Sequence, residues 1–258
     1  MRHSSSPAIV LHAIDHGDND RIVTFFTLRQ GKVTLIAKGA KKSIKRFAGV
    51  LELFSVLDLV WTDSRRQGLP VLQEATVLHP FEQIRTDVTR TAYASYWCEL
   101  VYAWTEPRQK QVAVYDLLEH TLARLNSDSV SEKVLHITFQ LRFMGINGFG
   151  PSFDTCLDCR MPIGRLGRTF IAFDVKRGGI LCNKCGQGAS GHTSLSMGTI
   201  NILRWVLTAP LEKTDRVKFS GRAIEESVNM LEPFLGYHLG KETKSLKFLK
   251  QLSTRLPY

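Results

Sequence analysis

Residues 8–78 alternate apolar and polar positions in the manner of short β-strands. Val33, Leu35 and Ala37, for example, occupy every second position of one stretch, as expected if one face of that strand is buried. Five short strands, with a longer gap between the third and the fourth, are typical of a small barrel such as the OB-fold. The pattern predicts these strands at residues 8–14, 21–28, 32–38, 51–61 and 69–78.

After Pro80 the apolar residues recur at the spacing of amphipathic helices. Glu106-Pro107 ends the first helix, and a capping box, Ser129-Val-Ser-Glu132, begins the third. We expect Pro233 to kink or split the last helix of residues 221–239, because proline lacks a backbone N–H group. The helices are predicted after Pro80, at residues 114–125, 132–143, 196–207 and 221–239.

The change of period predicts an α+β multidomain protein. A five-stranded OB-fold barrel is expected at residues 1–80, and an all-α helical domain at residues 81–258. With 43% hydrophobic residues the chain has enough apolar side chains for folded cores.

Two Cys-x-x-Cys pairs stand twenty-two residues apart. Each pair can turn two sulfur atoms toward the same point, and four thiolates around one ion form the tetrahedral arrangement that Zn²⁺ prefers in closed structural sites. We therefore predict one structural zinc ion per chain, held in an inserted ribbon at residues 152–190. The predicted ligands are Cys156, Cys159, Cys182 and Cys185.

Other interpretations of these cysteines are weaker. Disulfides would need an oxidising compartment, and the N-terminal residues lack the apolar run of a signal peptide. A redox dithiol usually has one such pair, and a catalytic zinc would need a coordination position that four cysteines do not leave open. The remaining cysteine, Cys98, lies among apolar residues and is expected in a core.

Charge points to a polyanionic partner. The chain has 34 Lys and Arg against 24 Asp and Glu, a formal net charge of +10, and such a surplus is typical of nucleic-acid-binding proteins. From Arg29 to Arg46 there are seven basic residues and no acidic one. A charge run alone favours a solvated loop, but this run belongs to a barrel type that binds single strands. The candidate DNA-binding residues are Arg29, Lys32, Lys38, Lys41, Lys42, Lys45, Arg46, Arg65 and Arg66.

Three aromatic residues near this run, Phe26, Phe47 and Trp61, are candidates for base stacking, although each alone is more typical of a barrel core. No membrane-spanning run and no catalytic motif is present in the sequence, so we predict a non-enzymatic protein. A metal-dependent nuclease or nucleotidyl transferase would need clustered carboxylates, and the only tight acidic group, at residues 15–20, coincides with a turn signal. A zinc-ribbon RNA-binding or transcription accessory protein is a further alternative.

The chain resembles the bacterial recombination and repair mediator family RecO over nearly its whole length. The most specific segments are Ala37-Lys38-Gly39-Ala40-Lys41-Lys42, Arg177-Gly178-Gly179 with the paired cysteines, and Tyr237-His238-Leu239-Gly240. Pro233 departs from the unbroken helix that similar proteins have, which leaves the geometry of the C-terminal helices open.

The resemblance implies a protein of the bacterial cytoplasm, associated with the nucleoid, that binds single- and double-stranded DNA and anneals complementary strands. It also implies that the protein, with RecR, helps load RecA onto DNA coated by the single-strand-binding protein. The basic residues Lys241, Lys244, Lys247 and Lys250 can extend the DNA track, receive the acidic tail of the single-strand-binding protein, or form a solvated final helix.

Overall fold

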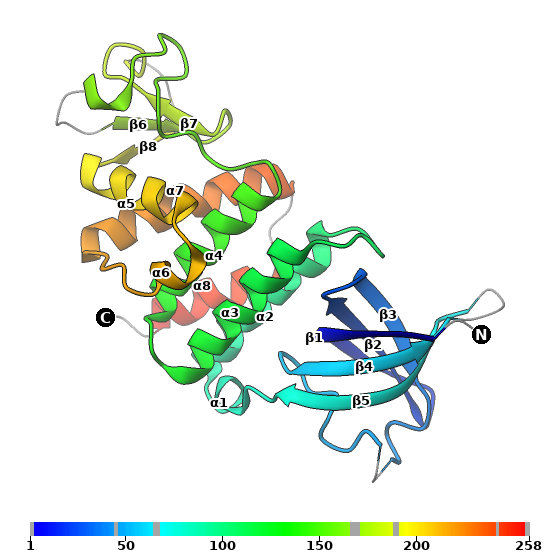
Figure 1. Ribbon diagram of the computed structural model, residues 1–258. Coiled ribbons are helices and arrows are strands. Elements are labelled where there is room, and N and C mark those ends of the chain that lie inside the picture. The colour runs from blue at the N-terminus through cyan, green and yellow to red at the C-terminus, as the bar shows by residue number, and fades with distance from the viewer. Residues whose placement is uncertain are drawn as a thin grey trace. The chain divides into compact units, whose positions relative to one another are not determined.

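The computed structural model describes residues 3–43, 46–63, 68–165, 171–187, 191–240 and 243–255. Five strands close into a barrel in the order β1-β2-β3-β5-β4, followed by helices (Figure 1). The predicted fold class, a five-stranded OB-like barrel before a helical region, is therefore confirmed. The strands are β1 (His3–His16), β2 (Asp20–Thr27), β3 (Gly31–Ala37), β4 (Val56–Thr62) and β5 (Val71–His79).

The fourth strand begins later than the sequence pattern predicts. Phe54 has a φ of 72°, which takes the backbone out of the extended conformation just before β4. This turn is nevertheless hydrogen-bonded to β1. The N–H of Phe54 donates to the carbonyl of Val10, and the N–H of Val10 donates to the carbonyl of Ser55. The apolar residues just before Val56 therefore belong to a turn, although their apolar pattern had predicted a strand.

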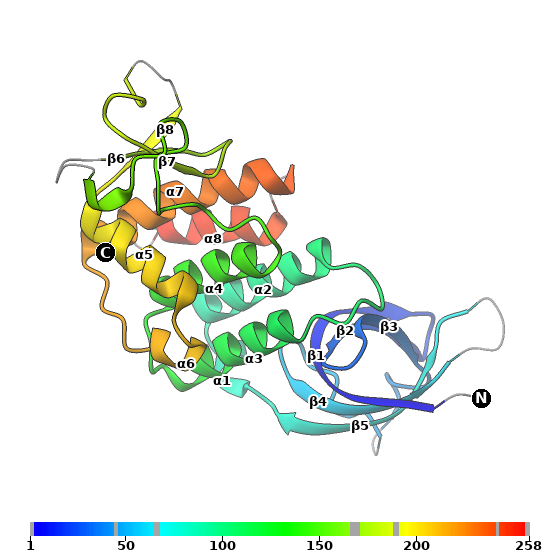
Figure 2. The same cartoon turned by 45° about the horizontal axis from the view of Figure 1, so that its top comes forward.

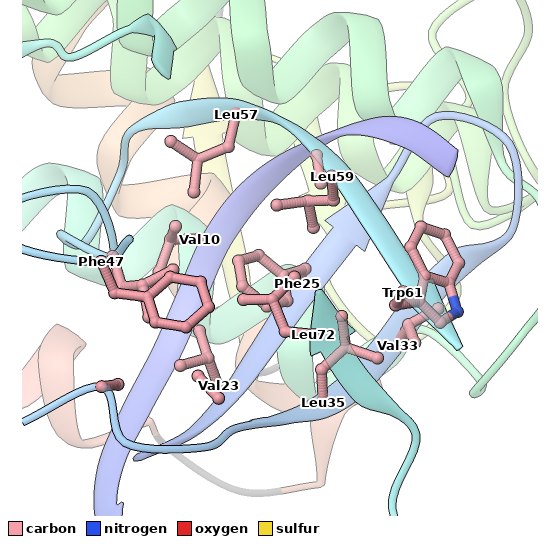
Figure 3. Packing of buried hydrophobic residues seen from close by; sticks show 14 residues of the cluster. Val10, Val23, Phe25, Val33, Leu35, Phe47, Leu57, Leu59, Trp61 and Leu72 are labelled. Atoms are coloured by element: carbon pink, nitrogen blue, oxygen red, sulfur yellow. The ribbon is translucent and has the colours of Figure 1, made fainter. Parts of the chain in front are cut away.

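Apolar side chains from all five strands fill the barrel (Figure 3). Phe25, Leu59 and Trp61 are each fully buried there. Phe47 is also part of this cluster, and Phe26 is completely buried as well. The three aromatic residues considered for base stacking are therefore core residues, because a small barrel fills its interior with side chains.

A segment after the second helix packs against the barrel at the β2–β3 turn. The N–H of Arg108 donates to the carbonyl of Lys32 at 2.9 Å. Gly31 has a φ of +67°, and a Cβ atom there would lie 1.8 Å from the carbonyl oxygen of Gln109. Only glycine fits this approach. The nearby helices are α1 (Glu82–Arg85), α2 (Val88–Trp104) and α3 (Val112–Ser127).

The last helix, α8 (Lys244–Arg255), packs on α2 although about a hundred and forty residues separate them in sequence. The carboxylate of Glu99 on α2 accepts the backbone N–H groups of Lys244 and Ser245 at 3.1 and 2.9 Å. A carboxylate at a helix N-terminus satisfies N–H groups that have no partner within the helix. Glu99 thus fixes where α8 begins.

Internal contacts divide the chain into two compact units, residues 1–128 with 243–258 and residues 129–242. The first three helices and α8 group with the barrel in this division. The sequence suggests a different boundary, between residues 80 and 81, where the strands end and the helices begin. That domain boundary stays a prediction, which limited proteolysis can test.

The second unit holds a three-stranded sheet in the order β7-β6-β8, with β8 against α7 (Figure 2). Phe173 on β6 contacts Phe153 and Phe234, with ring centroids 5.8 and 5.7 Å apart. These rings seat the sheet on its helix. The elements are α4 (Glu132–Ile146), the 3₁₀ helix η1 (Ile163–Arg165), β6 (Ile171–Asp174), β7 (Gly179–Leu181), β8 (His192–Leu195), α5 (Met197–Thr208), α6 (Leu211–Thr214) and α7 (Gly221–Leu239).

Helix α7 continues through Pro233, so the expected split does not occur. Proline removes the N–H group that would bond to the carbonyl four residues earlier, which is that of Asn229. The hydroxyl of Thr193 on β8 lies 3.5 Å from this carbonyl and donates to it. A neighbouring strand thus supplies a donor that the helix lacks.

Glu226 on α7 holds the start of α5. Its carboxylate accepts the N–H of Ser196 at 2.8 Å and the hydroxyl of Thr199 at 2.5 Å. Burial raises the pKa of Glu226, but hydrogen bonds from Thr199, Ser196 and Arg222 outweigh burial and lower the pKa below its usual range.

Among the described residues, no helix is long and apolar enough to cross a membrane.

We expect Gly31→Ala to destabilise the protein clearly more than Gly17→Ala. Both glycines have positive φ, which costs a residue with a Cβ about 1–2 kcal/mol. A Cβ at Gly17 meets no atom within 4 Å, whereas at Gly31 it meets backbone. Urea denaturation followed by circular dichroism measures both free energies of unfolding, and equal losses would contradict the close approach to Gln109.

Glu226→Gln should lower the free energy of unfolding by about 1–2 kcal/mol at neutral pH, as for a lost helix cap. Because the pKa of Glu226 is lower in the folded protein, the carboxylate stabilises the fold above its ordinary pKa of 4.5. That contribution is lost as pH falls through the folded pKa. The difference between wild type and variant should therefore shrink on acidification in denaturation curves, and a constant difference would show that the ionised carboxylate is not the source of the stabilisation.

Candidate metal centre and nucleic-acid interface

The four predicted cysteine ligands converge at one point. Their Sγ atoms all lie within 4.8 Å of one another, and those of Cys159 and Cys182 are 3.7 Å apart. A tetrahedron with metal–sulfur distances of about 2.3 Å has sulfur–sulfur edges of about 3.8 Å. A disulfide would need a separation of about 2.0 Å. The donor set therefore fits one shared metal ion, and four protein ligands close its coordination sphere.

Backbone N–H groups support the sulfur atoms. The N–H of Cys182 donates to Sγ of Cys156 at 3.3 Å, and the N–H of Cys185 donates to Sγ of Cys182 at 3.5 Å. The tight turn after the second pair is closed by the N–H of Gly186, which donates to the carbonyl of Cys182 at 2.8 Å. These hydrogen bonds help to orient the sulfur atoms of Cys156 and Cys182.

The protonation of the cysteines shows why a cation suits this point. Burial raises the pKa of Cys156, but backbone donors from Cys182, Cys159 and Asp158 outweigh burial and lower the pKa to about 6. Hydrogen bonding to Cys182, followed by burial, raises the pKa of Cys185 to about 12. The Cys156 thiolate forms readily, whereas the pKa values of Cys159 and Cys185 are raised, so these two thiols favour the neutral form. Further thiolates beside the first would repel it, and a bound metal ion would offset that repulsion.

The Arg177-Gly178-Gly179 segment packs against the first cysteine pair. The guanidinium of Arg177 forms an ion pair with Asp158, within the first pair, at 2.8 Å. A Cβ atom at Gly179 would lie 2.7 Å from the side chain of Leu157, and Gly178 turns with a φ of +67° against Phe234. Small residues are therefore required where the hairpin of β6 and β7 meets the first pair.

The basic run of the barrel is anchored to the core. Ala40, Phe47 and Leu51 belong to the buried cluster, so residues between β3 and β4 pack on the barrel at three points. Lys38 and Lys42 are exposed, and the ammonium group of neither forms a hydrogen bond or ion pair with any residue that the structure describes. Their charges are available to a polyanion.

Three other candidates have partners within the protein. Lys32 donates to the carbonyl of Tyr102 at 2.6 Å, and burial lowers its pKa. Lys41 pairs with Asp15 at 3.2 Å. Arg29 donates to the carbonyl of Ser5 at 3.1 Å. These contacts are between residues distant in sequence, which is why a count of charges did not reveal them.

Arg46 is fixed by two kinds of contact. Its guanidinium lies over the ring of Phe47, 4.7 Å from the centroid, and donates to the carbonyl of Gln73 at 2.9 Å. It ties the basic run to β5. The remaining candidates, Lys45, Arg65 and Arg66, lie outside the described residues.

The acidic turn of residues 15–20 has structural partners. Asp15 pairs with Lys41 and Arg21, and Asp20 accepts the N–H of Gly39 at 2.8 Å. Within the part of the chain that the structure describes, the only group of three or more His, Cys, Asp or Glu side chains that can share an ion is the four cysteines. These carboxylates therefore do not assemble the metal site that a nuclease would need.

Tyr102 and His12 are two exposed, neighbouring rings that the sequence pattern did not single out. A signal was available for the first of them, since Tyr102 is an aromatic residue off the apolar face of its helix. The sequence offered none for His12, because its neighbour is ninety residues away.

The fold and the cysteine centre define a class: an OB-barrel protein whose helical region carries a four-cysteine metal ribbon. Residues 1–81 match the family model described as recombination protein O N terminal, and residues 85–247 match the one described as recombination protein O C terminal. The chain belongs to the RecO family of DNA repair proteins.

Relatives named DNA repair protein RecO match along nearly their whole length. The one from Desulfatibacillum aliphaticivorans is 42% identical over 252 residues, which is 97% of this chain and 98% of that protein. The one from Desulfosudis oleivorans is 41% identical over 253 residues, covering 96% and 97%. The one from Syntrophus aciditrophicus is 35% identical over 245 residues, covering 94% and 93%.

Purified protein should contain about one metal ion per chain, bound by the four thiolates. Cys182→Ser should lose the ion and much of the stability of the ribbon, because metal-binding free energy is folding free energy in such sites. Elemental analysis and thermal unfolding measure both. Cys98→Ser is the matched control and should keep its metal. A Cys182→Ser protein that stays folded and fully loaded would show that the ligand set is wrong.

Proposed function

We propose that the protein is a DNA repair and recombination mediator that binds single- and double-stranded DNA and anneals complementary strands in the bacterial cytoplasm. Family membership supports the general role. The observation that supports DNA contact on the barrel is the pair of exposed, unpaired lysines, Lys38 and Lys42, held on a basic run that Phe47 and Leu51 anchor to the core.

Annealing needs no covalent step. Two phosphate backbones repel each other, and a cationic surface can screen both while it leaves the base edges free to pair. Anchoring matters here, because lysines on a rigid support lose less conformational freedom on binding than lysines on a loose loop. The absence of catalytic chemistry stays a prediction, and incubation of labelled DNA with the protein and Mg²⁺ tests it.

Within this proposal the protein works with RecR to help load RecA onto DNA coated by the single-strand-binding protein. The family is the support for these partners. The exposed lysines Lys244 and Lys247 on α8 are candidates either for more DNA contact or for the acidic tail of the single-strand-binding protein. Annealing of strands precoated with that protein is the experiment that tests the partnership.

The metal is proposed to be zinc in a structural role. Four thiolates suit Zn²⁺ and leave no coordination position for water or substrate. When bound, the ion would fix the two cysteine pairs, and Arg177 with Asp158 would hold the hairpin beside them. The RNA-binding alternative differs in ligand only, so competition between RNA and DNA of one sequence distinguishes it.

The double variant Lys38→Ala/Lys42→Ala should weaken binding of single-stranded DNA regardless of base sequence, because phosphate contacts carry no sequence information. If each lysine meets one phosphate, the slope of log K against log salt should flatten by about 0.7 per contact, or about 1.4 in all. Fluorescence anisotropy at several salt concentrations measures it, and annealing should fall in parallel.

The matched control is Lys213→Ala/Lys218→Ala, which removes two exposed lysines of the other unit and should keep the wild-type slope. Metal content should be unchanged in both proteins. A Lys38→Ala/Lys42→Ala protein with wild-type slope and annealing would return the basic run to a solvated surface without a DNA role.

A further inference from the structure

Two aromatic rings lie side by side at the surface of the barrel. The imidazole of His12 on β1 and the phenol ring of Tyr102 on α2 have centroids 5.7 Å apart and planes tilted by 42°. Both residues are exposed, Tyr102 by 43%. Phe26, Phe47 and Trp61 are buried, whereas these two rings are accessible at the surface, although the Lys32 ammonium lies over one face of the Tyr102 ring.

The pair of rings formed by His12 and Tyr102, here called the aromatic platform, is held in place on its Tyr102 side. Nζ of Lys32 donates to the carbonyl of Tyr102 at 2.6 Å and also lies 5.0 Å from the centroid of its ring. The helix ends just beyond, where the N–H and the hydroxyl of Thr105 both donate to the carbonyl of Val101. A cation at the ring and a capped helix end fix the position of Tyr102 before any ligand arrives.

The outer face of β1, β2 and β3 leads from this platform toward Lys38. Cross-strand pairing places two rows of side chains between them, and none of these side chains is acidic. His12 is level with Thr34 on β3, and Lys38 follows Thr34 by four residues, which is about 13 Å along a strand that rises about 3.3 Å per residue. The rows are His12, Thr24 and Thr34, then Ile14, Ile22 and Ile36.

The geometry points to a base-stacking site: His12 and Tyr102 stack unpaired nucleobases of a single strand whose phosphates contact Lys38 and Lys42. This inference rests on the proposed function and adds to it a site for the nucleobases, which the phosphate contacts leave without a binding partner. Non-specific single-strand binding combines a cationic track with aromatic side chains, and every base has a π-face that can stack. Duplex DNA offers no free face, so the platform favours single strands.

The test uses full-length protein with two probes, a single-stranded oligothymidylate and an abasic strand of equal length. Tyr102→Ala should weaken oligothymidylate binding by roughly 5- to 150-fold, the range for a lost base–aromatic stack. Tyr102→Phe keeps the ring and should bind as wild type. The salt slope should stay unchanged in both, because no phosphate contact is removed. On the abasic strand, Tyr102→Ala and wild type should bind alike.

Two further variants keep the result decisive. Tyr237→Ala removes a tyrosine that is 54% exposed on α7 and should leave both affinities unchanged. His12→Ala removes the other ring without altering α2, and it should also weaken oligothymidylate binding while sparing the abasic strand. If Tyr102→Ala does not fold, His12→Ala still tests the stacking site.

The outcomes separate this inference from the proposed function. If folded Tyr102→Ala and His12→Ala bind oligothymidylate as wild type, the stacking site is wrong, even where Lys38→Ala/Lys42→Ala flattens the salt slope. If both ring variants weaken the two probes equally, the loss is general and also overturns stacking. If the ring variants lose base-dependent binding while the lysine variant keeps the wild-type slope, the stacking site stands and the phosphate track is overturned.

Discussion

Burial of aromatic side chains inside a small barrel is the constraint on which the surface chemistry of this protein depends. Phe25, Phe47 and Trp61 enter the core because five short strands leave an interior that side chains must fill. Once Phe47 is buried, the residue before it is fixed at the surface, and Arg46 binds β5. The same packing leaves Lys42 in solvent. Hydrophobic burial thus decides which charges a polyanion can reach.

Carboxylates do structural work in both units. Glu99 accepts the first N–H groups of α8, which have no partner within the helix. Glu226 accepts the N–H of Ser196, whose hydroxyl in turn caps the N–H of Thr199 at the start of α5. In each case an acid on one helix helps to fix the start of another. Asp15 and Asp20 likewise hold the turn beside the basic run. Acidic groups that are occupied in this way leave a surface whose available charge is basic.

The ribbon combines three interactions of different kinds. The four sulfur atoms provide a closed site for an ion, Arg177 pairs with Asp158, and Phe173 packs between Phe153 and Phe234. The hydroxyl of Thr193 on the same sheet donates to the carbonyl that Pro233 leaves without a helical partner. Pro233 is thereby accommodated within α7, and β8 of the ribbon packs on this helix.

Local patterns in the sequence determined the barrel and most helices, and they singled out the four cysteines that the fold brings together. A period of two, a period near 3.6 and a Cys-x-x-Cys spacing are properties of adjacent residues, so no tertiary structure is needed to recognise them. The sequence did not determine the start of β4 or the continuity of α7, because a turn at Phe54 and a hydroxyl from another strand decide them.

Only the tertiary structure decided which basic residues are available and which rings are exposed. Lys32 binds a carbonyl seventy residues away, and His12 meets a ring on a distant helix. When two contacting side chains are far apart in the sequence, the packing of whole helices and strands decides that they meet. Neighbouring residues in one sequence contain no pattern that reveals this packing.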